Sequence, residues 1–166
     1  MRNFIHWLFH PYTNGYSAII LIRIFAGLVF LGEGILKFLF PSMGVTRFTL
    51  LGFPFPQLTS DFIGCVEIIG GICLLLGLFT NLVALIFAIE MVVAFLSTKI
   101  SMYLGTSPLP LPPVPPQVGF WAVVHESRAD YTQFLAMIFL MIVGPGKASL
   151  DALLFKQKNS DQSDRK

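Results

Sequence analysis

The sequence carries little charge for its length. Only 12% of its 166 residues are Asp, Glu, Lys or Arg, whereas soluble domains contain about 25%. Hydrophobic residues make up 55% of the chain, and the mean hydropathy is +0.75. A water-soluble monomer of this composition lacks the polar surface to cover itself. The composition therefore argues against a cytosolic enzyme, a nucleic-acid-binding protein and a disordered scaffold, and it indicates a protein whose partner is the lipid bilayer.

Cysteine and histidine are also scarce, with two and three copies. Cys65 and Cys73 lie two helical turns apart in one apolar run and form no CxxC motif, so we interpret them as packing residues. No histidine lies in an apolar run, which argues against a bis-histidine haem. No spacing of Cys, His and carboxylates predicts a metal site. His6 and His10 share one face of a short aromatic segment, and we interpret them as interfacial imidazoles.

Long apolar runs dominate what the sequence does contain. A membrane helix needs about 20 residues, and backbone groups in lipid must be satisfied within their own segment. The runs therefore predict an all-α, polytopic membrane four-helix bundle with spans at residues 17–40, 62–79, 82–98 and 128–143. The last span is short. We expect it to begin near Arg128, because Ser127 and Asp130 fit the pattern of a capping box.

The distribution of Lys and Arg predicts the orientation. Four spans place both termini on one side, which carries the larger basic set: Arg2, Lys147, Lys156, Lys158, Arg165 and Lys166. The opposite side carries Arg47, Lys99 and Arg128. The positive-inside rule then makes both termini cytoplasmic, in a multi-pass protein of the inner (cytoplasmic) membrane. We expect one domain over 1–155, a stiff Pro-rich outer loop at 107–116 and a polar, disordered tail at 156–166.

Ionisable residues inside the apolar runs are the strongest functional signal. Each costs roughly 2.5–3.5 kcal/mol at the bilayer centre, so such residues normally face the interior of a bundle. Their spacing agrees with this. One face of the first run carries Arg23, Gly27, Phe30, Gly34 and Lys37 at helical steps, and one face of the second carries Gly64, Glu67 and Gly71. Glu33 precedes Lys37 by four residues, the favourable order for an ion pair.

We expect most of these groups to meet in the outer half of the bundle. Glu67 and Glu33 are the predicted catalytic carboxyl groups, and the predicted ligand-binding residues are Lys37, Phe30, Glu90 and Gln133. Arg23 and Asp151 are predicted to form a structural ion pair near the cytoplasmic side. The same residues could instead serve only insertion and helix packing, and this alternative stays open.

Several motifs, in order, resemble the DoxX family of small four-helix membrane proteins. They are Arg23 to Phe38 in the first run, Leu51-Gly52-Phe53-Pro54 in the first loop, Gly64 to Thr80 in the second run, and Gly144 to Asp151 near the end. The resemblance covers residues 18–154. It implies a membrane protein tied to redox chemistry, since some members are subunits of a thiosulfate:quinone oxidoreductase. It also matches four polar residues of this chain to the family, namely Arg23, Lys37, Glu67 and Asp151.

Three functions follow as hypotheses. The first is a redox-associated subunit that binds a quinone-like ligand, exchanges protons through Glu67 or Glu33, and receives electrons from a soluble or membrane redox partner. The second is a small proton-coupled transporter that uses Glu33, Glu67 and Glu90. The third is a non-catalytic assembly or anchor protein. The sequence leaves the oligomeric state open, including a homo-oligomer.

Overall fold

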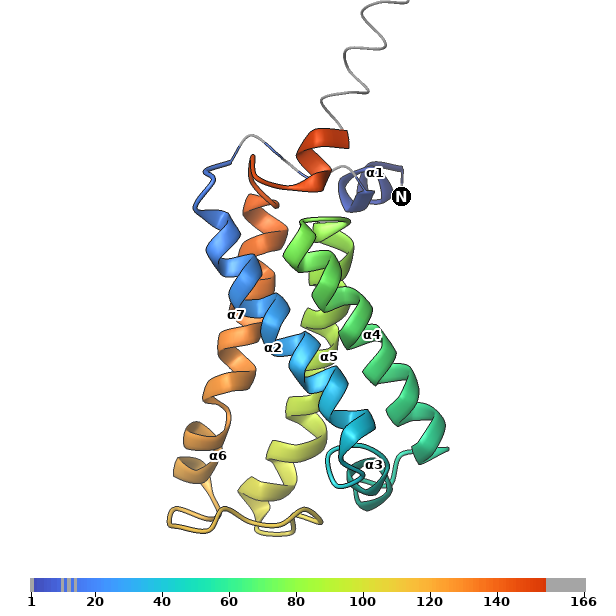
Figure 1. Cartoon of the computed structure of the whole chain (residues 1–166). Helices are drawn as coiled ribbons and strands as arrows, with labels where there is room; N and C mark the ends of the chain where they lie inside the picture. The colour runs from blue at the N-terminus through green and yellow to red at the C-terminus, as the bar shows by residue number, and fades with distance from the viewer. Residues whose placement is uncertain (1, 10, 12, 14, 155–166) are drawn as a thin grey trace, which may run out of the picture.

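The chain folds into helices joined by short connections and one longer loop. The computed structural model describes residues 2–9, 11, 13 and 15–154, with side chains from His6 onward, and these ranges contain no strand. Their helices are α1 (Arg2–Phe9), α2 (Ile19–Leu39), α3 (Val45–Leu50), α4 (Pro56–Leu76), α5 (Thr80–Leu104), α6 (Phe120–Glu126) and α7 (Arg128–Val143) (Figure 1). Among the described residues, α2, α4 and α5 are long and apolar enough to cross a membrane.

Two helices extend beyond their predicted ranges. Helix α4 begins at Pro56 rather than at residue 62, because proline is favoured in the first turn, where its missing N–H is not needed. Helix α5 runs on to Leu104 rather than ending at residue 98, and it stops at Gly105, which adopts a left-handed φ of 71°. The start of α4 and the end of α5 are therefore set by the backbone preferences of Pro56 and Gly105. They do not coincide with the limits of the apolar runs.

The predicted capping box before α7 is wrong in detail. Ser127 is the N-cap residue, but its hydroxyl makes no side-chain cap and is buried without a hydrogen-bond partner. Asp130 instead pairs with Lys99 of α5, at 3.2 Å between Nζ and Oδ2. The partner of Asp130 is thus Lys99 of the neighbouring helix α5, in place of the local contact near Ser127 that the capping-box pattern suggested.

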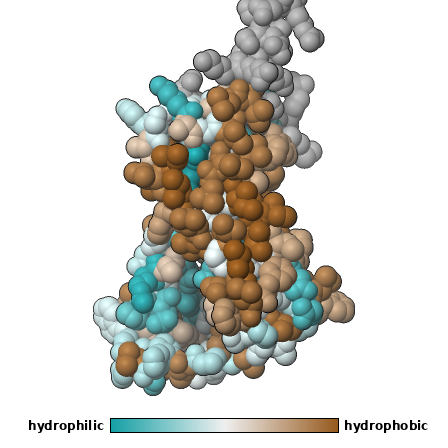
Figure 2. All heavy atoms as spheres, in the orientation of Figure 1, coloured by the Kyte–Doolittle hydropathy of each residue, from teal (hydrophilic) through white to brown (hydrophobic). Residues whose placement is uncertain are grey.

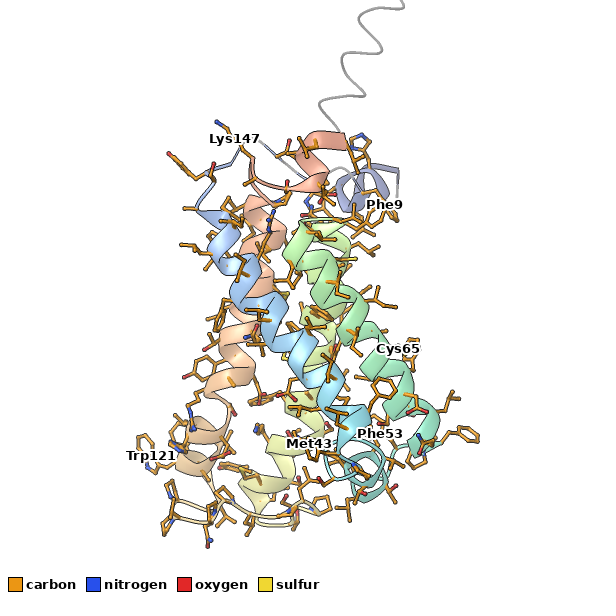
Figure 3. All side chains as sticks on the ribbon, viewed as in Figure 1. Phe9, Met43, Phe53, Cys65, Trp121 and Lys147 are labelled. Carbon is orange, nitrogen blue, oxygen red and sulfur yellow. The ribbon has the colours of Figure 1, made fainter. Side chains whose placement is uncertain are left out.

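Four helices, α2, α4, α5 and α7, run along the length of the molecule (Figure 1). Helices α3 and α6 lie at one end of this bundle, and α1 lies at the other. On the face shown in Figure 2, hydrophobic side chains cover the middle, and most hydrophilic ones gather toward the end that carries α3 and α6. We name the two ends the α3 end, marked by Met43 and Phe53, and the α1 end, marked by Phe9 and Lys147 (Figure 3).

Glycines bring α2 and α4 into close contact. A Cβ atom on Gly71 would lie 2.8 Å from the carbonyl oxygen of Gly27, and one on Gly34 would lie 2.8 Å from that of Gly64. Such distances are shorter than any real side chain allows, so these positions require glycine. Small residues that let two backbones meet are typical of membrane helix pairs. The contact turns the α4 face that carries Glu67 toward α2.

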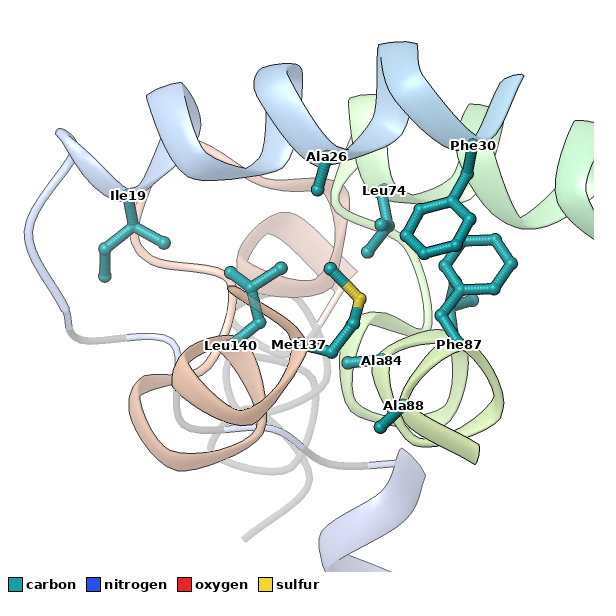
Figure 4. Close-up of a cluster of buried hydrophobic side chains, with 10 residues drawn as sticks. Ile19, Ala26, Phe30, Leu74, Ala84, Phe87, Ala88, Met137 and Leu140 are labelled. Carbon is teal, nitrogen blue, oxygen red and sulfur yellow. The ribbon is translucent and has the colours of Figure 1, made fainter. Parts of the chain in front are cut away.

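A hydrophobic core fills the half of the bundle nearer the α1 end. Phe30 and Phe87 stack at its border, with ring centroids 3.7 Å apart and planes 14° apart (Figure 4). Beyond them the core contains the fully or nearly fully buried side chains of Ile19, Ala26, Leu74, Ala84, Met137 and Leu140. This packing leaves the charged residues of the long helices, apart from Arg23, to the other half of the bundle.

At the α1 end, Arg23 and Asp151 are both buried, but each contacts backbone atoms. The carboxylate of Asp151 accepts hydrogen bonds from the N–H groups of Phe79 (2.9 Å) and Thr80 (3.0 Å), where it caps α5. Arg23 donates from Nη1 to the carbonyl oxygen of Pro145 at 3.0 Å.

The direct ion pair predicted for Arg23 and Asp151 is therefore absent from the contacts of the described residues, although the charge of Asp151 still acts on the guanidinium. The unsatisfied N–H groups at the start of α5 attract the carboxylate more strongly, because they offer two hydrogen bonds and the positive end of a helix dipole. His10 and the predicted tail at 156–166 lie outside the described residues.

Candidate functional site

A cavity of about 330 Å³ lies between the four long helices in the half nearer the α3 end. All six of the side chains predicted to be catalytic or ligand-binding line it, namely Phe30, Glu33, Lys37, Glu67, Glu90 and Gln133. Its mouth is formed partly by α3 and the loops that flank it, through Met43, Arg47, Phe48, Leu51 and Phe53. The structure thus brings residues from α2, α4, α5 and α7 to one place.

A buried ion pair joins α2 to α4 at this cavity. The ammonium group of Lys37 donates a hydrogen bond to Oε1 of Glu67 at 2.7 Å and lies 2.6 Å from its Oε2. The Lys37 side chain is 11% exposed and the Glu67 side chain 3%. The sequence suggested Glu33 as the partner of Lys37, but the glycine contact between α2 and α4 presents Glu67 to it instead.

Two further carboxyl groups stand beside this pair. The side chain of Glu90, on α5, lies within hydrogen-bonding reach of Glu67. Glu33 is more exposed and lines the cavity near enough for its charge to act on both of them. Two carboxyl groups can share a hydrogen bond only when one of them carries a proton. The group of three is therefore suited to holding a proton and passing it on.

Gln133 supplies a neutral polar group from α7. It is 4% exposed, and its Oε1 atom is buried with no hydrogen-bond partner. One oxygen of Glu90, Oε2, is buried and unpartnered in the same way. A buried acceptor without a partner is destabilising, so these two atoms leave hydrogen-bonding capacity open inside the cavity.

Sequence reasoning missed several residues of the cavity. Arg47 lines it, although in the sequence this residue served only to predict the orientation. Asp130 lines it too, on the same face of its helix as Gln133. Thr98 and Ala94, on α5, line it as well. Steps of four from Glu90 pass through Ala94 and reach Thr98, so the helical period could have found Thr98 as well. No pattern could have found Arg47, because a separate short helix carries it to the mouth.

The fold and the cavity together define a helical membrane protein with a polar, carboxyl-lined site inside an apolar exterior. Comparison with known proteins agrees. The profile of the DoxX family matches residues 18–100, and a relative described below is similar over most of the chain. The chain belongs to the DoxX family.

Two curated relatives extend the comparison. The uncharacterized membrane protein Rv3486 of Mycobacterium tuberculosis (strain ATCC 25618 / H37Rv) is 38% identical over 152 residues, which cover 88% of this chain and 86% of the relative. CatD of Bacillus subtilis (strain 168), whose name describes it provisionally as an oxidoreductase, is 26% identical over 141 residues, which cover 85% of this chain and 90% of the relative. No solved structure matches the chain significantly.

Proposed function

We propose that this protein binds a quinone-like ring in the cavity at the α3 end and serves as the membrane subunit of a redox system. The observation that carries the proposal is the meeting of an aromatic side chain, Phe30, with carboxyl groups and an unpartnered amide in one cavity. Its volume falls at the lower end of the range for small-molecule sites, about 300–1,000 Å³, which suits a ring head group. The name of the relative CatD points in the same direction.

Each cavity residue has a role in this proposal. Phe30, held by its stack on Phe87, presents a rigid apolar surface to the ring. Lys37 fixes Glu67 and adds positive charge beside the oxygen atoms of the ligand. Glu67, with Glu90 and Glu33, accepts or delivers protons.

The redox reaction needs a second protein. Conversion of a quinone to its diol consumes two electrons and two protons, and the reverse reaction releases them. The carboxyl groups of this chain handle the protons. The electrons pass to or from a redox partner, which is either soluble or embedded in the membrane.

The proposed setting is the inner membrane, with four spans and both termini in the cytoplasm. Helix α7 has only 16 residues, but α6 directly precedes it, and Lys99 of α5 binds both segments through the Glu126 carbonyl oxygen and Asp130. Cysteine labelling in whole cells tests the arrangement. A cysteine at Ser107 should react with an impermeant reagent, one at Lys147 should react only after lysis, and the reverse pattern would contradict the proposed orientation.

A proton-coupled transporter is the second candidate, and the three glutamates that share the cavity favour it. A transporter also needs access to its site from the opposite side. The stacked rings of Phe30 and Phe87 and the core behind them occupy that route (Figure 4). Proton flux into proteoliposomes that depends on Glu67 and on no quinone would favour this candidate over the first.

A binding experiment with a cavity-filling variant tests the first candidate. Ala94 lines the cavity, so Ala94→Phe should fill it and abolish saturable binding of 1,4-naphthoquinone to the protein in nanodiscs. Ile89 is 56% exposed on the same helix, so Ile89→Phe should bind as the unmodified protein does. Equal binding by both variants would show that the ring binds elsewhere. If Glu67→Gln folds and leaves binding and every phenotype intact, the anchor hypothesis is favoured.

A further inference from the structure

A second hollow lies at the surface of the bundle, between α5 and α7, and has a volume of about 200 Å³. We name it the α5–α7 groove. Apart from Asp130, its walls are apolar or aromatic side chains, namely Met91, Val92, Phe95, Leu96, Tyr131 and Phe134. Several of them are open to the surroundings of the bundle, since Val92 is 43%, Tyr131 49% and Leu96 53% exposed. In a membrane this groove faces the hydrocarbon of the bilayer.

The groove is continuous with the cavity. Met91 and Asp130 line both of them. The thioether side chain of Met91 is unbranched and adapts its shape readily. The carboxylate of Asp130 is paired with Lys99 at 3.2 Å, and Lys99 is held in turn by the Glu126 carbonyl oxygen at 3.0 Å. The boundary between the two hollows therefore includes one adaptable side chain and one fixed ion pair.

Other borders of the cavity suit a hydrocarbon chain less well. Toward the α1 end, the stacked rings of Phe30 and Phe87 and the core behind them fill the bundle. At the mouth near α3, the chain would pass the guanidinium group of Arg47, and an apolar chain against a charged group takes water away from it. The one ionisable side chain of the groove, Asp130, already has its partner. The groove is thus the border best suited to an apolar chain.

From this continuity we infer that the ligand of the cavity carries a hydrocarbon tail, and that the tail leaves through the α5–α7 groove into the bilayer. The inference rests on the proposed function and names the substrate class, a lipid-anchored ring rather than a small soluble one. Lipid chains are as apolar as the walls of the groove, so the tail gains little affinity there. The groove provides passage, and blocking it should exclude tailed ligands only.

A matched pair of ligands and a matched pair of variants test the inference. The ligands are radiolabelled 1,4-naphthoquinone and 2-geranyl-1,4-naphthoquinone, and their saturable binding is measured with the full chain in nanodiscs. Empty nanodiscs give the share of each ligand that dissolves in the lipid. Val92→Trp fills the groove without touching the cavity. Ile72→Trp on α4 is the control, because Ile72 is 44% exposed and lines neither hollow.

The unmodified protein should bind both ligands, with similar affinities relative to their concentrations in the lipid. Val92→Trp should weaken binding of the geranyl compound by about tenfold or more and leave 1,4-naphthoquinone unaffected, and Ile72→Trp should change neither. The inference is overturned if Val92→Trp keeps the geranyl compound, if it weakens both ligands equally, or if the unmodified protein rejects the tail. Binding of 1,4-naphthoquinone in those cases leaves the proposed function standing. Failure of both ligands to bind the unmodified protein would overturn the proposed function, and the inference with it.

Photolabelling locates the tail directly. A diazirine at the end of the geranyl chain should label α5 and α7 near Val92, Leu96 and Tyr131, as read by mass spectrometry, and excess 1,4-naphthoquinone should remove the label. Labelling of α3 in place of the groove would show that the tail leaves through the mouth, against the inference. A groove label that survives the excess would show only a dissolved chain resting on the surface, and would overturn it as well.

Discussion

Removing the cation of the buried ion pair should be the most damaging single change at the cavity. Lys37 lies 2.6 and 2.7 Å from the two oxygens of Glu67. At such distances, Coulomb's law with an effective dielectric constant of about 20 gives about 6 kcal/mol of attraction. Desolvation of the two charges offsets much of this gain. Breaking a buried pair by deleting one partner typically costs about 3–5 kcal/mol, and we expect Lys37→Met to lower the free energy of unfolding by this amount.

The measurement is reversible unfolding by sodium dodecyl sulfate in mixed micelles. Adding Glu67→Gln to Lys37→Met should recover about 2 kcal/mol or more, because the second change removes the uncompensated charge. Lys99→Met is the matched control. Its partner Asp130 is 27% exposed, and Lys99 also donates to the Glu126 carbonyl oxygen. Losing both contacts should cost less than losing the buried pair, about 1–2 kcal/mol. A Lys37→Met variant as stable as the control, or strictly additive effects in the double variant, would refute the pairing argument.

Three further predictions concern the scaffold. Gly27→Ala should destabilise the bundle by about 1–3 kcal/mol, because its Cβ would lie 2.9 Å from the Gly71 carbonyl oxygen. Gly32→Ala is the control and should not destabilise it, because the space around its Cβ is open. Equal melting temperatures of the two variants in detergent would contradict this prediction. Asp151→Ala should cost about 1–2 kcal/mol by removing the cap of α5, and an unchanged melting temperature would show that the cap is dispensable. Ser127→Ala should be neutral or slightly stabilising, since its hydroxyl is unpartnered, and a loss above about 1 kcal/mol would indicate a capping role after all.

The helical faces of the site were predictable from the sequence, and the contacts between them were not. The steps from Gly64 to Glu67 to Gly71 placed Glu67 on the face that meets another helix, and the glycine contact with Gly27 agrees with that expectation. Spacing within one helix could not say whether Lys37 would pair with Glu33 or with Glu67. That choice depends on how α2 crosses α4, which is a property of residues distant in the sequence.

The contacts of residues outside the four long helices escaped prediction for a similar reason. Arg47 reaches the cavity because α3 folds over the end of the bundle and packs on α4. Asp151 finds its partners at the start of α5, 71 and 72 residues away in the sequence. Hydropathy and periodicity describe segments one at a time, so they carry no information about such contacts.

The most direct test of the central claim is an experimental structure of the protein in a lipid nanodisc, prepared from its own membrane without added ligand or with 1,4-naphthoquinone present. We predict flat, ring-shaped density next to Phe30 and within hydrogen-bonding distance of the Gln133 amide group, with the Lys37–Glu67 pair intact beside it. A cavity closed by collapse of α5 onto α2, or Glu67 and Glu90 turned outward to the lipid, would contradict it.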